Sequence, residues 1–238
     1  MPILYVTATP IGNLNDLSSR ALFVLKTVDF ILCEDTRTTH KILAHFGIKT
    51  KLISYHQHSK TREIKNIINL LRQTREAALV CEAGTPGISD PGGKLIETAL
   101  SEIPELKIVP IPGPSAITAG LSIAGLPADK FIFLGFPPNK KKRKKFFEEA
   151  VSSDYTVVFY ESPYRIVKSL EDLKNSLIDA GKLESTKVVV CRELTKIHET
   201  IYRGGVREVL EEIQKEFREQ KRVKGEFVVI IKTRRVPR

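Results

Sequence analysis

The sequence predicts an α/β protein built from two α/β domains. In residues 1–115, short apolar strands alternate with amphipathic helices, and after residue 126 the strand content rises. Alternation of strands and helices implies a mostly parallel sheet with helices on both faces. Glycine- and proline-rich loops directly follow three of the first strands, where ligands gather in open α/β folds.

The first half contains five expected strands and four expected helices. Apolar runs predict strands at 3–7, 30–33, 51–54, 77–81 and 107–110. Apolar residues at helical spacing predict helices at 17–26, 38–46 and 61–74, and a fourth that begins near Leu95. Gly47 ends the second of these helices, as glycine commonly does.

The second half has more strand character. Small residues predict a helix over 115–126, and Leu126-Pro-Ala-Asp-Lys130 marks a change of unit. We expect strands at 131–134, 155–160, 187–190 and 227–231 and helices at 163–180 and 206–220. The expected domains are 1–115 and 116–238, with a cleft between them.

Composition restricts the class of protein. The 238 residues, of which 42% are hydrophobic and 28% charged, are typical of a globular protein with a substantial core. No apolar run is long enough to cross a membrane, and the N-terminus enters a strand directly. We therefore expect no signal peptide, no membrane partner and a cytoplasmic location. Cys33, Cys81 and Cys191 end apolar runs, which predicts buried free thiols, and no cluster has metal-ligand spacing.

Positive charge is concentrated in the second half. Residues 1–115 carry 13 basic and 11 acidic side chains, whereas residues 116–238 carry 25 and 17. The excess lies in the runs 140–145, 221–224 and 234–238. Such clusters attract nucleic acid through counterion release. The alternative is a lysine-rich solvated surface, but six adjacent basic residues repel one another without a partner.

Three loops are candidates for one ligand pocket. They are 8–14, 82–93 and 110–116, and each follows a strand. The first lacks the G-x-G-x-x-G pattern of a dinucleotide site. The second combines stiff prolines with glycines that expose the backbone, which suits an uncharged or zwitterionic ligand. Tight turns, or an N-cap at Ser115, are the alternatives.

Charged side chains follow other strands. Cys33-Glu-Asp-Thr-Arg37 offers Glu34 or Asp35 to orient a substrate hydroxyl and Arg37 to hold a phosphate. His56 follows the next strand and is a further substrate candidate. Helix capping by Asp35 or Thr36 is the structural alternative. Tyr160–Arg165 and Cys191–Lys196 also end strands, and internal ion pairs among Arg192, Glu193 and Lys196 would explain the second of them.

Six segments in order resemble the tetrapyrrole-methylase family, and within it the subgroup that methylates ribosomal RNA. They are 5–14, 33–37, 82–93, 112–116, 160–165 and 192–196, and they span nearly the whole chain. The resemblance implies two α/β domains with S-adenosylmethionine between them, 2′-O-methylation of a cytidine ribose in small-subunit rRNA, and a homodimer. Thr9-Pro10 and Thr85 replace the glycine-rich loop and the aspartate of relatives that methylate tetrapyrroles.

The resemblance also implies roles for individual residues. Cofactor contacts fall on Pro10, Ile11, Thr85, Ile88, Ser115, Ala116, Glu161, Arg192 and Gly225. The residues themselves, taken with this reaction, make Glu34, Asp35 and Lys196 unranked candidates for a catalytic base and Arg37, His56, Lys140, Lys141, Lys142 and Arg143 candidates for binding RNA. Two rival functions stay open: a methyltransferase acting on a free tetrapyrrole, and a non-catalytic RNA-binding assembly factor.

Overall fold

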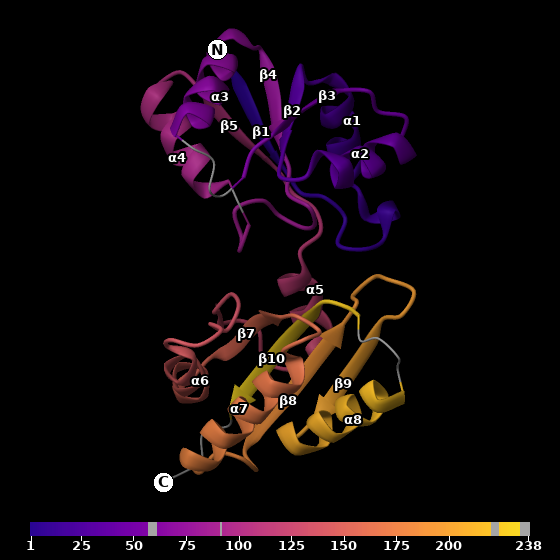
Figure 1. Cartoon of the computed structure of the whole chain (residues 1–238), viewed down its shortest axis with the longest axis vertical. Coiled ribbons are helices and arrows are strands. Elements are labelled where there is room, and N and C mark those ends of the chain that lie inside the picture. The colour runs from indigo at the N-terminus through magenta and orange to yellow at the C-terminus, as the bar shows by residue number, and fades with distance from the viewer. Residues whose placement is uncertain (57–60, 91, 220–223, 234–238) are drawn as a thin grey trace. The chain divides into compact units, whose positions relative to one another are not determined.

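The computed structural model describes residues 1–56, 61–90, 92–219 and 224–233, with the side chain of Thr61 excepted. It divides into two compact units, Met1–Ser115 and Ala116–Arg238, and each is described by itself (Figure 1). Among the described residues, no helix is both long and apolar enough to cross a membrane.

Unit 1 is a parallel sheet of strand order β3-β2-β4-β1-β5. The strands are β1 (Ile3–Thr7), β2 (Phe30–Cys33), β3 (Lys51–Ser54), β4 (Glu76–Leu79) and β5 (Lys107–Ile111). The helices are η1 (Leu14–Asp16, a 3-10 turn), α1 (Ser19–Thr27), α2 (Thr36–His45), α3 (Thr61–Gln73) and α4 (Gly93–Glu102). Pro110 lacks an N–H donor, and β5 accommodates it because it is an edge strand.

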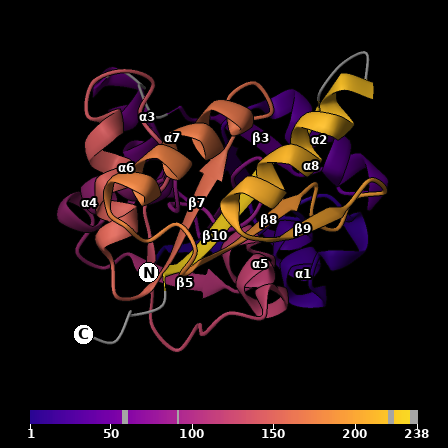
Figure 2. The same cartoon turned by 90° about the horizontal axis from the view of Figure 1, so that it is seen from below.

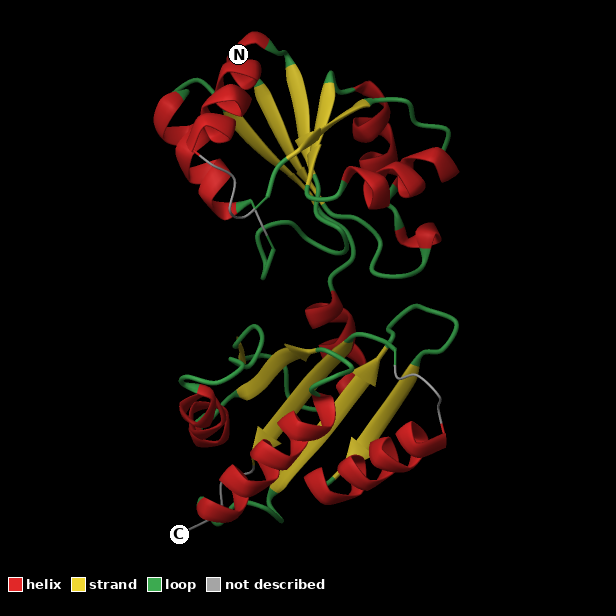
Figure 3. Cartoon of the chain, viewed as in Figure 1, coloured by secondary structure: helices red, strands yellow, loops and turns green. Residues whose placement is uncertain are grey.

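Helices cover both faces of this sheet. The pairs α1 and α2, and α3 and α4, lie on opposite sides of it (Figure 3). Side chains alternate along each strand, so neighbouring residues of β2 enter different cores. Leu32 packs with the α3 and α4 residues Ile68 and Leu95, whereas Ile31 packs with Leu25 of α1. The central strands are buried on both faces, which explains their continuous apolar sequences.

Unit 2 is a mixed sheet of order β6-β7-β10-β8-β9. Only β6 and β7 pair in parallel, and the other neighbours are antiparallel. The strands are β6 (Phe131–Phe133), β7 (Thr156–Glu161), β8 (Thr186–Arg192), β9 (Thr200–Gly204) and β10 (Phe227–Thr233). The helices are α5 (Ala116–Ala124), α6 (Arg143–Ser152), α7 (Ile166–Asp179) and α8 (Val206–Glu219).

The core of unit 2 lies between one sheet face and the helices α6, α7 and α8. Figure 2 shows α7 and α8 on one side of this sheet and α5 on the other. Gly120 lets α5 approach β10 closely, since a Cβ there would lie 3.3 Å from both Val228 and Ile230 side chains.

Candidate functional site

Three loops meet at the carboxyl ends of β4, β1 and β5, which are neighbours in the unit 1 sheet. Thr9 and Gly84 exchange two backbone hydrogen bonds, of 2.9 and 3.0 Å. The Ala8 amide donates to Ile111 (3.2 Å), and the Thr85 hydroxyl donates to the Pro114 carbonyl (3.2 Å). The loops 8–14, 82–93 and 112–115 are therefore tied to one another rather than being independent turns.

Two glycines permit this close packing. A Cβ on Gly113 would lie 3.0 Å from the Cβ of Ala8, which is itself buried. Gly84 has a φ of +84°, in the left-handed region that favours glycine. The loops after β1 and β5 thus touch through backbone and methyl groups, and larger side chains would separate them.

The chemistry of these loops suits a cationic, partly apolar ligand. Residues 8–16, 81–93 and 110–116 contain no lysine or arginine, in a chain with 38 of them. Pro10 and Ile11 are buried, Ile88 is 44% exposed, and Thr85, Ser115 and Ala116 are half-buried. S-adenosylmethionine combines a sulfonium with apolar and hydrogen-bonding parts, so this residue set fits it and is unsuited to a polyphosphate.

Asp35 and Glu34 follow β2 but lie in different environments. Asp35 caps α2, because its carboxylate accepts from the Arg37 amide (2.7 Å). This backbone hydrogen bond is the main reason why its pKa is lowered. Glu34 is half-buried, and within the described residues its carboxylate has no hydrogen bond or ion pair. Glu34 is therefore the better placed of the two to accept a substrate proton.

Lys196 is a poor general base. Its ammonium contacts Glu193 (2.8 Å) and Glu226 (2.9 Å). Burial alone would lower its pKa, but the hydrogen bonds to these two carboxylates outweigh burial and raise the pKa. A base must be unprotonated to accept a proton, so Lys196 is assigned to an ion-pair cluster and not to catalysis.

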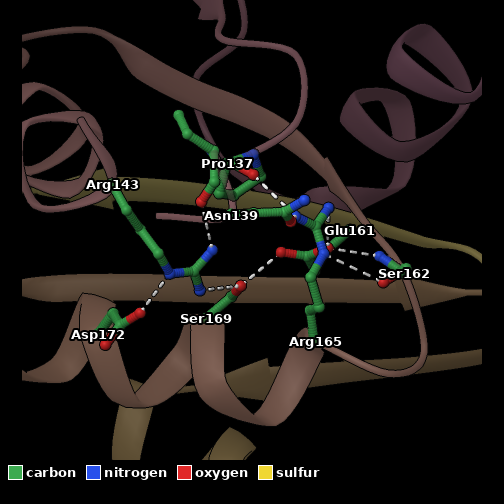
Figure 4. A network of polar contacts seen from close by, with 9 residues as sticks. Pro137, Asn139, Arg143, Glu161, Ser162, Arg165, Ser169 and Asp172 are labelled. Atoms are coloured by element: carbon green, nitrogen blue, oxygen red, sulfur yellow. Dashed lines mark hydrogen bonds and ion pairs between the residues drawn. The ribbon is translucent and has the colours of Figure 1, made fainter. Parts of the chain in front are cut away.

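Glu161 ends β7 inside a polar network (Figure 4). It is 1% exposed, and its carboxylate accepts from the Ser162 amide (2.7 Å) and the Ser169 hydroxyl (2.5 Å). Arg165 completes an ion pair with it at 2.8 Å. Ser169 was not among the predicted site residues, although Glu161, Arg165 and Ser169 recur at intervals of four, the spacing of one helix face. Because its oxygens have partners within the protein, Glu161 supports the strand end rather than offering its charge to a cofactor.

Arg192, at the end of β8, also has its hydrogen-bonding groups paired within the protein. Its guanidinium donates to the Lys224 carbonyl (2.8 and 3.2 Å), pairs with Glu216 (2.5 Å) and lies over the Phe217 and Phe227 rings. Gly225 has a φ of +126°, and a Cβ there would meet the Glu193 and Arg192 side chains at 3.0 and 3.2 Å. These residues fix the segment that enters β10.

Arg143 differs from the expected RNA-binding role. It is 7% exposed, and its guanidinium binds Asp172 (2.7 Å), Ser169 (2.8 Å) and the Pro138 carbonyl (3.1 Å). The prediction that it contacts RNA is wrong, because the side chain points into unit 2 and its donors are used there (Figure 4). Lys140, Lys141 and Lys142 are exposed.

Two other expected substrate residues are also exposed. Arg37 has an exposed side chain, and His56 lies 2.9 Å from the Ser54 hydroxyl through its Nε2. Residues 221–223 of the basic run 221–224, and the whole run 234–238, lie outside the described residues. Cys33, Cys81 and Cys191 are buried and free, as predicted, and no group of three metal-ligating side chains occurs in the described ranges.

Comparisons with known proteins agree with this architecture. The family model of the tetrapyrrole (corrin/porphyrin) methylases matches residues 4–210. The chain aligns over its whole length with the methyltransferase CobJ (18% identity, 98% of that chain, TM-score 0.69). It aligns over 97% of its length with the cobalt precorrin-4 methyltransferase CbiF (16% identity, 94% of that chain, TM-score 0.69). At these identities the similarity shows the fold.

Curated relatives are much more similar in sequence. Proteins named ribosomal RNA small subunit methyltransferase I share 43% identity with the chain in Hydrogenobaculum sp. and 44% in Vibrio cholerae. The alignments cover 96% and 97% of this chain, and 94% and 77% of the relatives. The relative from Thermotoga maritima is 39% identical over 96% of this chain and 97% of its own length. The chain therefore belongs to the tetrapyrrole methylase family, in the group of the ribosomal RNA small subunit methyltransferase I proteins.

Proposed function

We propose that this protein transfers a methyl group from S-adenosylmethionine to the ribose 2′-oxygen of a cytidine in small-subunit rRNA. Its near full-length identity of 39–44% to relatives named for this rRNA carries the proposal. The loops of unit 1, which lack basic side chains, support a sulfonium cofactor. The exposed lysines of unit 2 support a polyanionic substrate.

Binding of the cofactor is assigned to the hydrogen-bonded loops of unit 1 and to Ala116, the residue that follows the last of them in the sequence. When bound, S-adenosylmethionine supplies an electrophilic methyl group on a positively charged sulfur. The Ser115 hydroxyl would bind its polar groups, the Thr85 hydroxyl, which donates to Pro114, would accept a hydrogen bond from it, and Pro10, Ile11, Ile88 and Ala116 would line its apolar parts. The lack of basic side chains in these loops avoids repulsion of the sulfonium.

Glu34 is the proposed base. Its carboxylate would accept the proton of the ribose hydroxyl as that oxygen is methylated, and S-adenosylmethionine, when bound, would supply the methyl group. Asp35 holds the start of α2 in place through the cap, and this orients Glu34 and Arg37 on either side of it in the chain. Arg37 binds the phosphate next to the target ribose. The protein otherwise contributes chiefly alignment of oxygen, carbon and sulfur.

The substrate is further proposed to be the assembled subunit, and the enzyme a cytoplasmic homodimer. In stacked duplex RNA the reactive groups are hidden, so recognition requires an accessible or splayed-out nucleotide. Lys140, Lys141 and Lys142 supply affinity that does not depend on sequence.

The decisive experiment is methyl transfer from labelled S-adenosylmethionine to small subunits that lack the modification. Nuclease digestion and mass spectrometry then identify the labelled nucleotide. Label on a cytidine ribose is the expected result. Glu34→Gln should lower kcat by about 10²–10⁴-fold and leave cofactor affinity unchanged, since it removes only the base.

Two outcomes would reject the proposal. Absence of label on RNA together with methylation of a free tetrapyrrole would favour a small-molecule methyltransferase. Absence of cofactor binding in calorimetry would favour a non-catalytic assembly factor. A wild-type rate in Glu34→Gln would remove Glu34 from catalysis and leave the reaction itself intact.

A further inference from the structure

Tyr164 is 81% exposed, although aromatic side chains usually bury most of their area. It lies in the turn Ser162–Arg165 that follows β7, where the Arg165 amide donates to the Ser162 carbonyl (3.1 Å). Pro163 occupies the second position of this turn, where its fixed φ is favourable. The ring is therefore presented to solvent by a defined backbone, and burial in the core does not explain it.

Arg165 fastens this turn to the neighbouring loop. Its guanidinium pairs with Glu161 at 2.8 Å and donates to the Pro137 carbonyl at 3.0 Å. It also donates to the Asn139 side chain. Asn139 immediately precedes Lys140, so the turn that carries Tyr164 is bonded to the start of the lysine triplet 140–142 (Figure 4).

The other end of the triplet is fixed by the same network. Arg143, which follows Lys142, donates to Ser169, and Ser169 donates to Glu161. Two buried hydrogen bonds thus connect Arg143, through Ser169, to the Glu161 carboxylate, which also pairs with Arg165. The three exposed lysines and the exposed tyrosine are carried by one rigid assembly.

The charge of this assembly selects the partner. Residues 136–147 contain six basic side chains and no acidic one, and Arg143 alone among the basic residues is buried. An aromatic ring beside exposed cations is the arrangement with which proteins bind single-stranded nucleic acid, because bases stack on the ring while the cations contact phosphates.

We propose that Tyr164 stacks on an unpaired base of the RNA substrate while Lys140, Lys141 and Lys142 contact its backbone. This inference rests on the proposed function, because it assumes that the substrate is rRNA. It adds a base-contacting residue outside the cofactor loops and outside the segment 33–37. A rigid turn reduces the entropy lost on binding, so one ring has a measurable effect on affinity.

The test measures affinity for unmodified small-subunit rRNA and for intact subunits over a range of salt concentrations. Tyr164→Ala should weaken binding at least about tenfold and leave the salt dependence unchanged, because it removes stacking and no charge. Tyr164→Trp should restore affinity. Lys140→Gln with Lys141→Gln should reduce the slope of log affinity against log salt by about 1.4. Lys142 stays unchanged because it is the N-cap position of α6.

Tyr155→Ala is the matched control, since this tyrosine is also exposed (44%) but precedes β7 at its opposite end. Its affinity should equal that of the wild type. Equal affinities of Tyr164→Ala and wild type for both the rRNA and the intact subunits would overturn the stacking proposal. Failure of the wild type to bind or methylate either RNA would instead reject the proposed function, and this inference with it.

Discussion

Arg143 points into unit 2 because it occupies the inner face of α6. Phe146, Phe147 and Ala150 follow it at spacings of three, four and seven, and all are buried. The guanidinium lies 5.2 Å from the Phe147 ring centroid and binds Asp172. Arg143 stands in a run of six basic residues, which favoured its assignment to RNA binding. Its helical spacing to the three apolar residues nevertheless predicts that its side chain faces the core.

The role of this residue is testable against its neighbour. Arg143→Met should lower the free energy of unfolding by about 2–4 kcal/mol, because Ser169 and Asp172 lose a buried partner. Lys141→Met, two residues earlier and exposed, should change it by less than about 0.5 kcal/mol. Urea denaturation of both variants measures this difference. Equal stabilities would mean that the network contributes no net energy.

At the scale of elements, prediction succeeded where a segment's own sequence determined its structure. The strands β1, β2 and β3 have the predicted bounds, because each is a short segment centred on apolar residues. The helix α6 and the strand β9 were missed. Lysines obscured the apolar face of α6, and β9 is an edge strand with polar residues that gains its order from pairing with β8.

The candidate site shows the same limit. The loops after β1, β4 and β5 could be predicted because glycine, proline and strand ends are local features. Whether a charged residue at a strand end is available to a ligand depends on distant partners. Arg192 is bonded to Lys224 and Glu216, and neither partner could be inferred from the segment 192–196.

The packing of the unit 1 loops gives a prediction for these elements. Gly113→Ala should weaken S-adenosylmethionine binding about tenfold, because the new methyl group forces the loops after β1 and β5 apart. Gly93→Ala, at the start of α4, is the matched control, since a Cβ there meets nothing within 4 Å. Isothermal calorimetry compares the two. If both variants bind S-adenosylmethionine with equal affinity, the contact between the loops after β1 and β5 does not contribute to cofactor binding.

At the scale of the whole molecule, the two units share a response to alkaline pH. Three buried groups have raised pKa values, and burial is the main cause of each shift. Burial raises the pKa of Cys81 in unit 1 to about 12 and that of Cys191 in unit 2 to about 11. Burial and the hydrogen bond to Glu216 raise the pKa of Tyr202 to about 12. Each group is held in its neutral form by folding, and each has a lower pKa when the chain unfolds.

The sign of the pH dependence follows from these shifts. In the unfolded chain the thiols lose their protons near pH 9 and the tyrosine near pH 10, at lower pH than in the folded protein. The contribution of the three groups to the free energy of unfolding is therefore complete below pH 9. It is lost as pH rises through the folded values of about 11 and 12. Each group adds at most about 1.4 kcal/mol per pH unit to the fall in the free energy of unfolding.

The variant Tyr202→Phe should be less stable than the wild type at pH 7.5, because it lacks the hydrogen bond to Glu216. It should nevertheless lose less stability than the wild type between pH 9.5 and 11.5, because it has no phenol to ionise. Urea denaturation across this range tests the point, and parallel curves for variant and wild type would show that ionisation of Tyr202 is not coupled to folding.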